Sequence, residues 1–299
     1  MERRGILDVD QEKDFYRETT GFIGEKIIAD ILEKELVVKP LIIFDYRFEI
    51  DGNERQIDCL LIFQHECILI EVKNYTGEYL FDSNEMYFAS NKERLEQQPF
   101  SQIGTTKSML KKLFDEKDIR MKITEKIIFP NQDFYMYNDH RDLPTVYAAT
   151  LSQFIDELNK KSCWLNDKHQ NILQKLMSSR VSLSKYYLPI QCEFEVLKKG
   201  ITCGQCEGWL QLNERKKLVC NTCAQNENFD TAIIRGAKEF STLFPDKKIT
   251  ISVMAEWIDY KISRSTLYRI LNKHLKAEGS YKSRYYLLEK DCVNENTGH

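Results

Sequence analysis

The sequence predicts an α/β protein with a large N-terminal domain built on a mixed β-sheet, followed by two small modules. Three observations support this prediction: a helical segment followed by three β-rich runs, two Cys-x-x-Cys pairs thirteen residues apart, and a basic helical segment near the C-terminus. At 299 residues the chain exceeds one ordinary core and has room for two or three. The expected division is a domain at 1–180, a linker at 181–198, and modules at 199–228 and 229–299.

The N-terminal domain is expected to begin with a helix at about 20–35, where apolar side chains recur at helical spacing. Three β-rich runs follow, joined by turns, and then a short hairpin. They lie at 41–44, 56–63, 67–72 and 77–88.

The second half of this domain alternates helices and strands. Pro99 sits where a first helical turn tolerates proline and opens a helix to about residue 115. Strands are expected next at 123–129 and 145–150, and helices at 151–160 and 169–177. This order predicts a mixed sheet covered by helices.

Two acidic residues and a lysine lie on neighbouring predicted strands. Glu71 and Lys73 are two residues apart, so the strand period places them on one face. Asp58 lies on the preceding strand and can approach Glu71 laterally. Adjacent carboxylates in a half-buried sheet repel unless a cation lies between them, and oxygen ligands favour magnesium or manganese. We therefore predict a Mg²⁺ or Mn²⁺ site of Asp58 and Glu71, to which Glu25 adds a carboxylate through water or a second ion.

Four short motifs resemble those of the NERD family, the nuclease-related domain, which is grouped with the PD-(D/E)xK nucleases. They are Gly24-Glu25, Gln56-Ile57-Asp58, residues 70–75 and residues 98–102, and the resemblance covers about 15–117. It implies a restriction-endonuclease-like mixed sheet flanked by helices. It also implies metal ligation by Asp58 and Glu71, a catalytic Lys73, and supporting roles for Glu25 and Gln56. The order Glu, Asp, Glu-x-Lys is similar to that of archaeal Holliday-junction resolvases, which adds branched DNA to the expected substrates.

The expected function is that of a divalent-metal-dependent DNA endonuclease. A bound ion can polarise a phosphoryl oxygen and lower the pKa of a water, while Lys73 orients that water or stabilises charge developing on phosphorus. Three alternatives stay open. A lone Glu-x-Lys on an exposed strand is usually a cross-strand ion pair. A nuclease fold without turnover would be a DNA-binding adaptor or regulator, and the substrate could be RNA.

Four cysteines have the spacing of a metal site. Cys203-x-x-Cys206 and Cys220-x-x-Cys223 form two knuckles around a hairpin that carries Trp209. Four thiolates match tetrahedral structural zinc, and the metal would stabilise a module too small to bury much core. The alternative, a redox dithiol, needs only one pair. The sequence therefore predicts a zinc ribbon.

The last module resembles helix-turn-helix proteins such as resolvases. A short helix is expected at 249–257 and a second one after Ser263, which is placed as its N-cap. Residues 261–284 hold seven Lys or Arg against one acid, and 280–288 could form a wing. The alternative is a packed helical hairpin with a solvated basic face. The residues expected to face DNA are Arg264, Ser265, Thr266, Arg269 and Lys273.

Other features limit the classes of function. No apolar run approaches the ~18–20 residues that span a bilayer, and the first residues are polar, so a cytoplasmic location without membrane contact is expected. No phosphate-loop motif is present, so ATP hydrolysis is not expected. The expected partner is duplex, single-stranded or branched DNA. A homo-oligomer is left open, because PD-(D/E)xK nucleases often pair.

Overall fold

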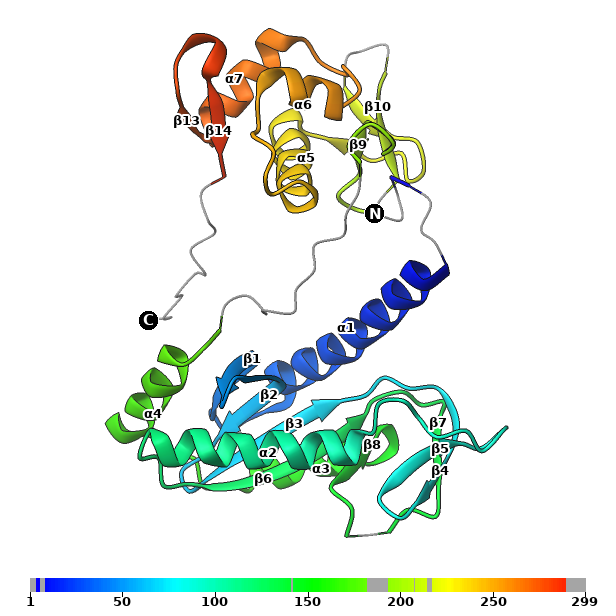
Figure 1. The fold of residues 1–299 in the computed structure, drawn as a ribbon, viewed down its shortest axis with the longest axis vertical. Coiled ribbons are helices and arrows are strands. Elements are labelled where there is room, and N and C mark those ends of the chain that lie inside the picture. Colours follow the sequence, from blue (N-terminus) through cyan, green and yellow to red (C-terminus); the bar gives the residue numbers. More distant parts are fainter. Residues whose placement is uncertain are drawn as a thin grey trace. The chain divides into compact units, whose positions relative to one another are not determined.

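The structure is a computed structural model of the chain (Figure 1), and it describes residues 4–5, 9–140, 142–181, 193–206, 208–213 and 217–288. The chain forms two compact units. We call Val9–Tyr187 the sheet unit, and Met1–Asp8 together with Leu188–His299 the cysteine unit. Most of the linker expected at 181–198 lies outside the described residues. None of the described helices is long and apolar enough to cross a membrane.

A five-stranded mixed sheet forms the centre of the sheet unit, in the order β1-β2-β3-β6-β8. The strands β1 (Leu41–Ile50), β2 (Asn53–Ile62) and β3 (Glu66–Val72) form an antiparallel meander. The strands β6 (Lys122–Phe129) and β8 (Thr145–Tyr147) continue from β3 in parallel. The mixed sheet predicted from the sequence is confirmed.

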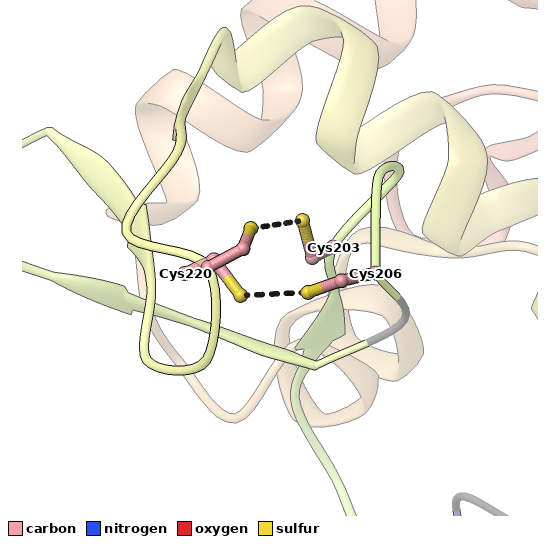
Figure 2. Close-up of side chains that lie close together, drawn as sticks. Cys203, Cys206 and Cys220 are labelled. Atoms are coloured by element: carbon pink, nitrogen blue, oxygen red, sulfur yellow. Dashed lines mark hydrogen bonds between the residues drawn. The ribbon is translucent and has the colours of Figure 1, made fainter.

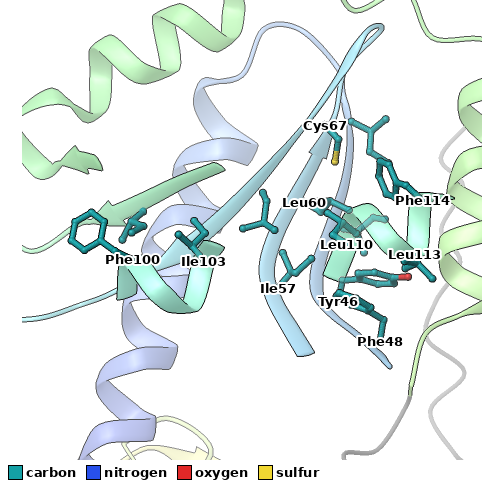
Figure 3. Close-up of a cluster of buried hydrophobic side chains, with 14 of the residues drawn as sticks. Tyr46, Phe48, Ile57, Leu60, Cys67, Phe100, Ile103, Leu110, Leu113 and Phe114 are labelled. Atoms are coloured by element: carbon teal, nitrogen blue, oxygen red, sulfur yellow. The ribbon is translucent and has the colours of Figure 1, made fainter. Parts of the chain in front are cut away.

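Helices cover both faces of this sheet. The helix α2 (Pro99–Glu116) packs Phe100, Ile103 and Leu110 on one face, in a core shared with Ile57 and other strand residues (Figure 3). On the opposite face, α1 (Val9–Glu35) and α3 (Leu151–Asn159) pack against the other side of β2 and β3. The helix α4 (Asp167–Ser178) closes the first core through Leu176.

The helix α1 begins eleven residues earlier than the sequence pattern indicated. Residues 9–19 are mostly polar, so they carry no apolar periodicity that would reveal a helix. Of the apolar residues that suggested the helix, Ile28 and Leu32 are buried, whereas Phe22 and Ile23 are exposed.

A small second sheet borders the first, in the order β5-β4-β7. The strands β4 (Gly77–Asp82) and β5 (Glu85–Phe88) are the hairpin that the sequence predicted. The strand β7 (Phe134–Tyr137), which the sequence analysis did not expect, pairs in parallel with β4.

The cysteine unit combines a small antiparallel sheet with three helices. Its strands lie in the order β12-β11-β10-β9. In chain order they are β9 (Ile201–Thr202), β10 (Trp209–Leu212), β11 (Leu218–Cys220) and β12 (Asn226–Glu227). The helices are α5 (Phe229–Leu243), α6 (Ile251–Trp257) and α7 (Arg264–His274), followed by the paired strands β13 (Lys276–Glu278) and β14 (Tyr285–Leu287). The helix α5 was not expected from the sequence.

The strands and helices of the cysteine unit share one hydrophobic core. Leu210 and Leu218 from the strands are buried with Phe240, Trp257 and Leu271 from the helices. Phe194, which was expected in the linker, lies in the same core and stacks on Trp257 with ring centroids 5.8 Å apart. The strands β9–β12 therefore form one wall of a core that they share with the helices α5, α6 and α7.

Arg4 ties the start of the chain into the cysteine unit. Its side chain is buried, and its guanidinium donates two hydrogen bonds of 2.7 Å to the carboxylate of Glu239. It also donates to the carbonyl of Lys198 and lies 3.8 Å from the centroid of the Trp257 ring. The cysteine unit is thus discontinuous, because its first residues precede the whole sheet unit in the chain.

Candidate active site and cysteine cluster

The five residues predicted for the catalytic site line one cavity of about 430 Å³ in the sheet unit. Glu25 comes from α1, Gln56 and Asp58 from β2, and Glu71 and Lys73 from the end of β3. The structure therefore brings together side chains that span 49 positions of the sequence (25 to 73).

Glu71 is the most buried acid of the cavity, with 2% of its surface exposed. Its Oε1 accepts hydrogen bonds from Lys73 Nζ at 2.7 Å and from Gln102 Nε2 at 2.5 Å. Its Oε2 is also buried, and no donor among the described residues reaches it. A buried carboxylate oxygen without a partner is costly, so this atom fits a metal ligand.

Side chains along β1 and β2 alternate between the two faces of the sheet, and at Asp58 this alternation shifts by one residue. Ile57 and Cys59 are two residues apart, yet they belong to the cores on opposite faces of the sheet. Asp58 Oδ2 accepts a 2.7 Å hydrogen bond from the backbone N–H of Val72 on β3. Burial, followed by the negative charge of Glu71, raises the pKa of Asp58 to about 8. A divalent cation would relieve both effects, because it favours the ionised form.

Gly24 allows Glu25 to approach the sheet. A Cβ atom at Gly24 would lie 2.6 Å from Cβ of Asn74, so any other residue would push α1 away from the end of β3. Asn74 Nδ2 also donates to the carbonyl of Thr20, which holds α1 in place. Burial, and then the charges of Asp45 and Glu71, raise the pKa of Glu25.

The three acids of the cavity do not form one tight cluster of ligands. In the described part of the chain, no three carboxylates bring ligand atoms within 4.8 Å of one another. The charge of Glu71 raises the pKa of Asp58 more than the charge of Glu25 does. Asp58 accepts a hydrogen bond from Val72, the chain neighbour of Glu71, so the two acids lie on adjacent strands where their oxygens could hold one ion, and hard oxygen donors suit Mg²⁺ or Mn²⁺.

Lys73 stays charged in this setting. Burial is the largest single influence and would lower its pKa, but the charges of Glu71, Tyr75 and Asp58 and the hydrogen bond to Glu71 together raise the pKa above the ordinary lysine value. A lysine in this state is an electrostatic group and cannot act as a base.

Two further cavity residues contact or surround these groups. Gln56 is exposed at the rim, where its Oε1 accepts from Arg47 Nη2 at 2.9 Å. Gln102, in the first half of α2, orients Glu71 through the hydrogen bond described above. Gln102 belongs to the motif at 98–102 but had no predicted role, and the signal that could have revealed one was its position just after Pro99, which starts the helix.

The four spaced cysteines converge in the cysteine unit (Figure 2). Their sulfur atoms all lie within 4.8 Å of one another, with Sγ–Sγ distances of 3.8 Å for Cys203 and Cys223 and 3.5 Å for Cys206 and Cys220. Four sulfurs about 2.3 Å from a tetrahedral zinc ion lie about 3.8 Å apart. The cluster is therefore compatible with zinc.

Backbone N–H groups support this cluster in both knuckles. The N–H of Gln205 donates to Cys203 Sγ, and the N–H of Thr222 donates to Cys220 Sγ, each at 3.4 Å. Hydrogen bonds from the backbone lower the pKa of the Cys220 thiol to about 6, which favours the thiolate that a metal binds.

The residues predicted to face DNA lie along α7, but several are already engaged. Ser263 caps the helix by accepting from the N–H of Thr266, and its hydroxyl lies 3.0 Å from that of Ser265. Lys273 Nζ lies 2.8 Å and Arg269 Nη2 lies 3.8 Å from the carboxylate of Asp230 at the start of α5, and His274 Nε2 lies 2.9 Å from it. The hydrogen bond from Lys273, followed by that from His274, lowers the pKa of Asp230 to about 2. Arg264 is exposed at the first turn.

Comparisons with known proteins found one family model and one solved structure that resemble parts of this chain. Residues 20–130 match the family model described as the nuclease-related domain. Among solved structures, the chain is similar to the small subunit of the heterodimeric restriction endonuclease R.BspD6I, at 13% sequence identity and a TM-score of 0.23, over 52% of this chain and 80% of that chain. No curated protein gave a match to the sequence. Residues 20–130 of the sheet unit are thus similar to the nuclease-related domain.

Proposed function

We propose that this protein is a divalent-metal-dependent endonuclease of the PD-(D/E)xK type that hydrolyses phosphodiester bonds of DNA. One observation carries the proposal: Asp58, Glu71 and Lys73 line one cavity, and a buried oxygen of Glu71 has no partner among the described residues. These three residues belong to the part of the chain that matches the nuclease-related domain.

Asp58 and Glu71 would hold Mg²⁺ or Mn²⁺. When bound, such an ion supplies positive charge that polarises a phosphoryl oxygen and acidifies a nearby water. Gln102 donates a hydrogen bond to Oε1 of Glu71, so Oε2 of Glu71 would be the ligand atom. Lys73, whose ammonium group lies 2.7 Å from Glu71, would stabilise the negative charge that develops on the phosphate oxygens. Glu25, a half-buried carboxyl with a raised pKa, is suited to take up a proton from the attacking water.

The cysteine unit would bring the protein to DNA. Cys203, Cys206, Cys220 and Cys223 would bind a structural zinc ion. The helix α7 with the paired strands β13 and β14 would contact DNA as a winged helix-turn-helix, with Arg264 at the exposed first turn. Because Asp230 neutralises part of the charge of Arg269 and Lys273, we expect these two to contribute less than Arg264.

Cleavage of defined substrates tests the proposal. The purified full-length chain should cut plasmid, single-stranded or branched DNA in Mg²⁺ or Mn²⁺, and EDTA should abolish the reaction. The same assay with RNA substrates would show whether the protein cleaves DNA or RNA. Binding of DNA without cleavage in any divalent ion would reject the enzyme and leave a DNA-binding adaptor or regulator.

A further inference from the structure

The cavity of the candidate active site continues from the acids onto an aromatic wall. Its lining includes Tyr16 and Arg17 from the first turns of α1, and Tyr75 and Tyr79 after β3. Tyr16 and Arg17 precede residue 20, so they lie outside the segment that matches the nuclease-related domain. The outer part of this wall, Tyr16 and Arg17, is therefore a feature of this chain that the match does not describe.

The inner part of the wall is packed against neighbouring aromatic rings. The rings of Tyr75 and Tyr79 are stacked, with centroids 5.6 Å apart and an interplanar angle of 26°. Tyr79 is buried and packs in turn on Phe134, with centroids 5.2 Å apart. The partly exposed ring of Tyr75 is thus fixed from behind, which suits a surface on which a planar group stacks.

The outer part of the wall is exposed. Tyr16 is 70% exposed, although it borders a cavity. The side chain of Arg17 is 62% exposed, and its Nη2 pairs with Asp14 at 2.7 Å on the same helix. An exposed ion pair of this kind is weak, so Arg17 can exchange its carboxylate partner for a phosphate.

We propose that this cavity receives one unstacked nucleotide, with its base against Tyr16 and Tyr75 and a neighbouring phosphate on Arg17. The substrate of the site is accordingly single-stranded nucleic acid. The cleavage part of this inference rests on the proposed nuclease function, whereas the binding part does not.

The physical reason lies in what each substrate exposes. In a duplex the faces of the bases are covered by their neighbours, so an aromatic wall inside a cavity has nothing to stack on. A single strand presents every base face, and stacking on aromatic side chains is a common source of its affinity. The cavity volume of about 430 Å³ lies within the range of small-ligand pockets, about 300–1,000 Å³.

Fluorescence anisotropy in Ca²⁺, under conditions without turnover, tests the binding. The probes are a labelled single-stranded DNA 20-mer, the RNA of the same sequence, and the blunt DNA duplex. Tyr16→Ala should weaken single-strand binding about 5- to 150-fold, the range expected for one lost stacking contact. Tyr16→Trp should restore it, and duplex binding, which the cysteine unit would provide, should not change.

Two variants complete the design. Phe15→Ala is the matched control, because Phe15 is an exposed aromatic neighbour (43% exposed) that does not line the cavity. It should bind single strands as the wild type does. Arg17→Gln should reduce the salt dependence of single-strand binding by a slope of about 0.7, as expected for one phosphate contact.

The proposal is overturned if Tyr16→Ala binds the single strand like the wild type, or if Phe15→Ala loses as much affinity as Tyr16→Ala. Tyrosine-dependent binding without cleavage in Mg²⁺ or Mn²⁺ would overturn the proposed nuclease and leave the single-strand site standing. Cleavage that does not depend on Tyr16 would overturn the single-strand site and leave the proposed nuclease standing.

Discussion

Glu71→Gln is expected to lower the single-turnover rate of DNA cleavage by on the order of 10³-fold or more, because it removes a charged metal ligand. The substitution keeps the shape of the side chain, so the buried position should still pack. It also removes the negative partner that holds the Lys73 ammonium at 2.7 Å. The rate is measured with excess enzyme on a labelled oligonucleotide in Mg²⁺, alongside thermal unfolding to verify the fold.

Two further variants serve as comparisons for the rate of Glu71→Gln. Gln102→Ala leaves the ligand in place and removes only the hydrogen bond that orients it, so the loss should be about 10- to 100-fold. Glu78→Gln removes an exposed carboxylate on β4 that does not line the cavity, so the rate should match that of the wild type. A Glu71→Gln rate within tenfold of the wild type would show that this carboxylate is not a metal ligand in catalysis.

Loss of zinc should unfold much of the cysteine unit and leave the sheet unit intact. The four strands β9–β12 are two to four residues long, so ligation of the cysteines has to contribute much of their stability. Since these strands form one wall of the shared core, their loss also exposes residues such as Phe240 and Trp257. Cys206→Ser should reduce bound zinc from about one ion per chain. It should also lower the melting temperature of this unit by at least about 10 °C.

Cys163→Ser is the matched control for zinc. Cys163 is a half-buried cysteine of the sheet unit, remote in sequence from both knuckles, so zinc content should stay at that of the wild type. Zinc is measured by metal analysis after dialysis, and unfolding of each unit by calorimetry. If Cys206→Ser kept its full zinc content and melting temperature, Cys206 would not be a ligand.

The central sheet and the convergence of the site were predictable because both follow from local periodicity. The alternation of β2 and β3, with a tight turn between them, brings Asp58 close to Glu71. The orientation of Asp58 was not predictable. It depends on a shift of alternation opposite Asp45, whose backbone φ is 47°, and the sequence pattern does not reveal such a position.

Contacts between residues far apart in sequence explain the remaining differences. Arg4 and Glu239 are 235 positions apart, and nothing in the sequence around Arg4 indicates that this arginine is buried. Asp230 contacts Arg269 and Lys273 only because α5 and α7 pack together, so the basic excess counted along the sequence overstates the free positive charge of α7.

The helix α5 was missed for a local reason. It has apolar residues at helical spacing, but Gly236 in its middle weakens the pattern.

Proton release on Mn²⁺ binding tests the central claim, that Asp58 and Glu71 share a divalent ion. A pKa of about 8 leaves the metal-free Asp58 protonated at pH 7, and the ion binds the ionised form. Affinity should therefore rise with pH up to about 8 and level off above it. Calorimetry in buffers of different ionisation enthalpy should find net proton release on Mn²⁺ binding at pH 7, and this release should disappear as the pH is raised above the pKa of Asp58. Mn²⁺ binding of unchanged affinity in Asp58→Asn, or no binding by the wild type, would contradict the account.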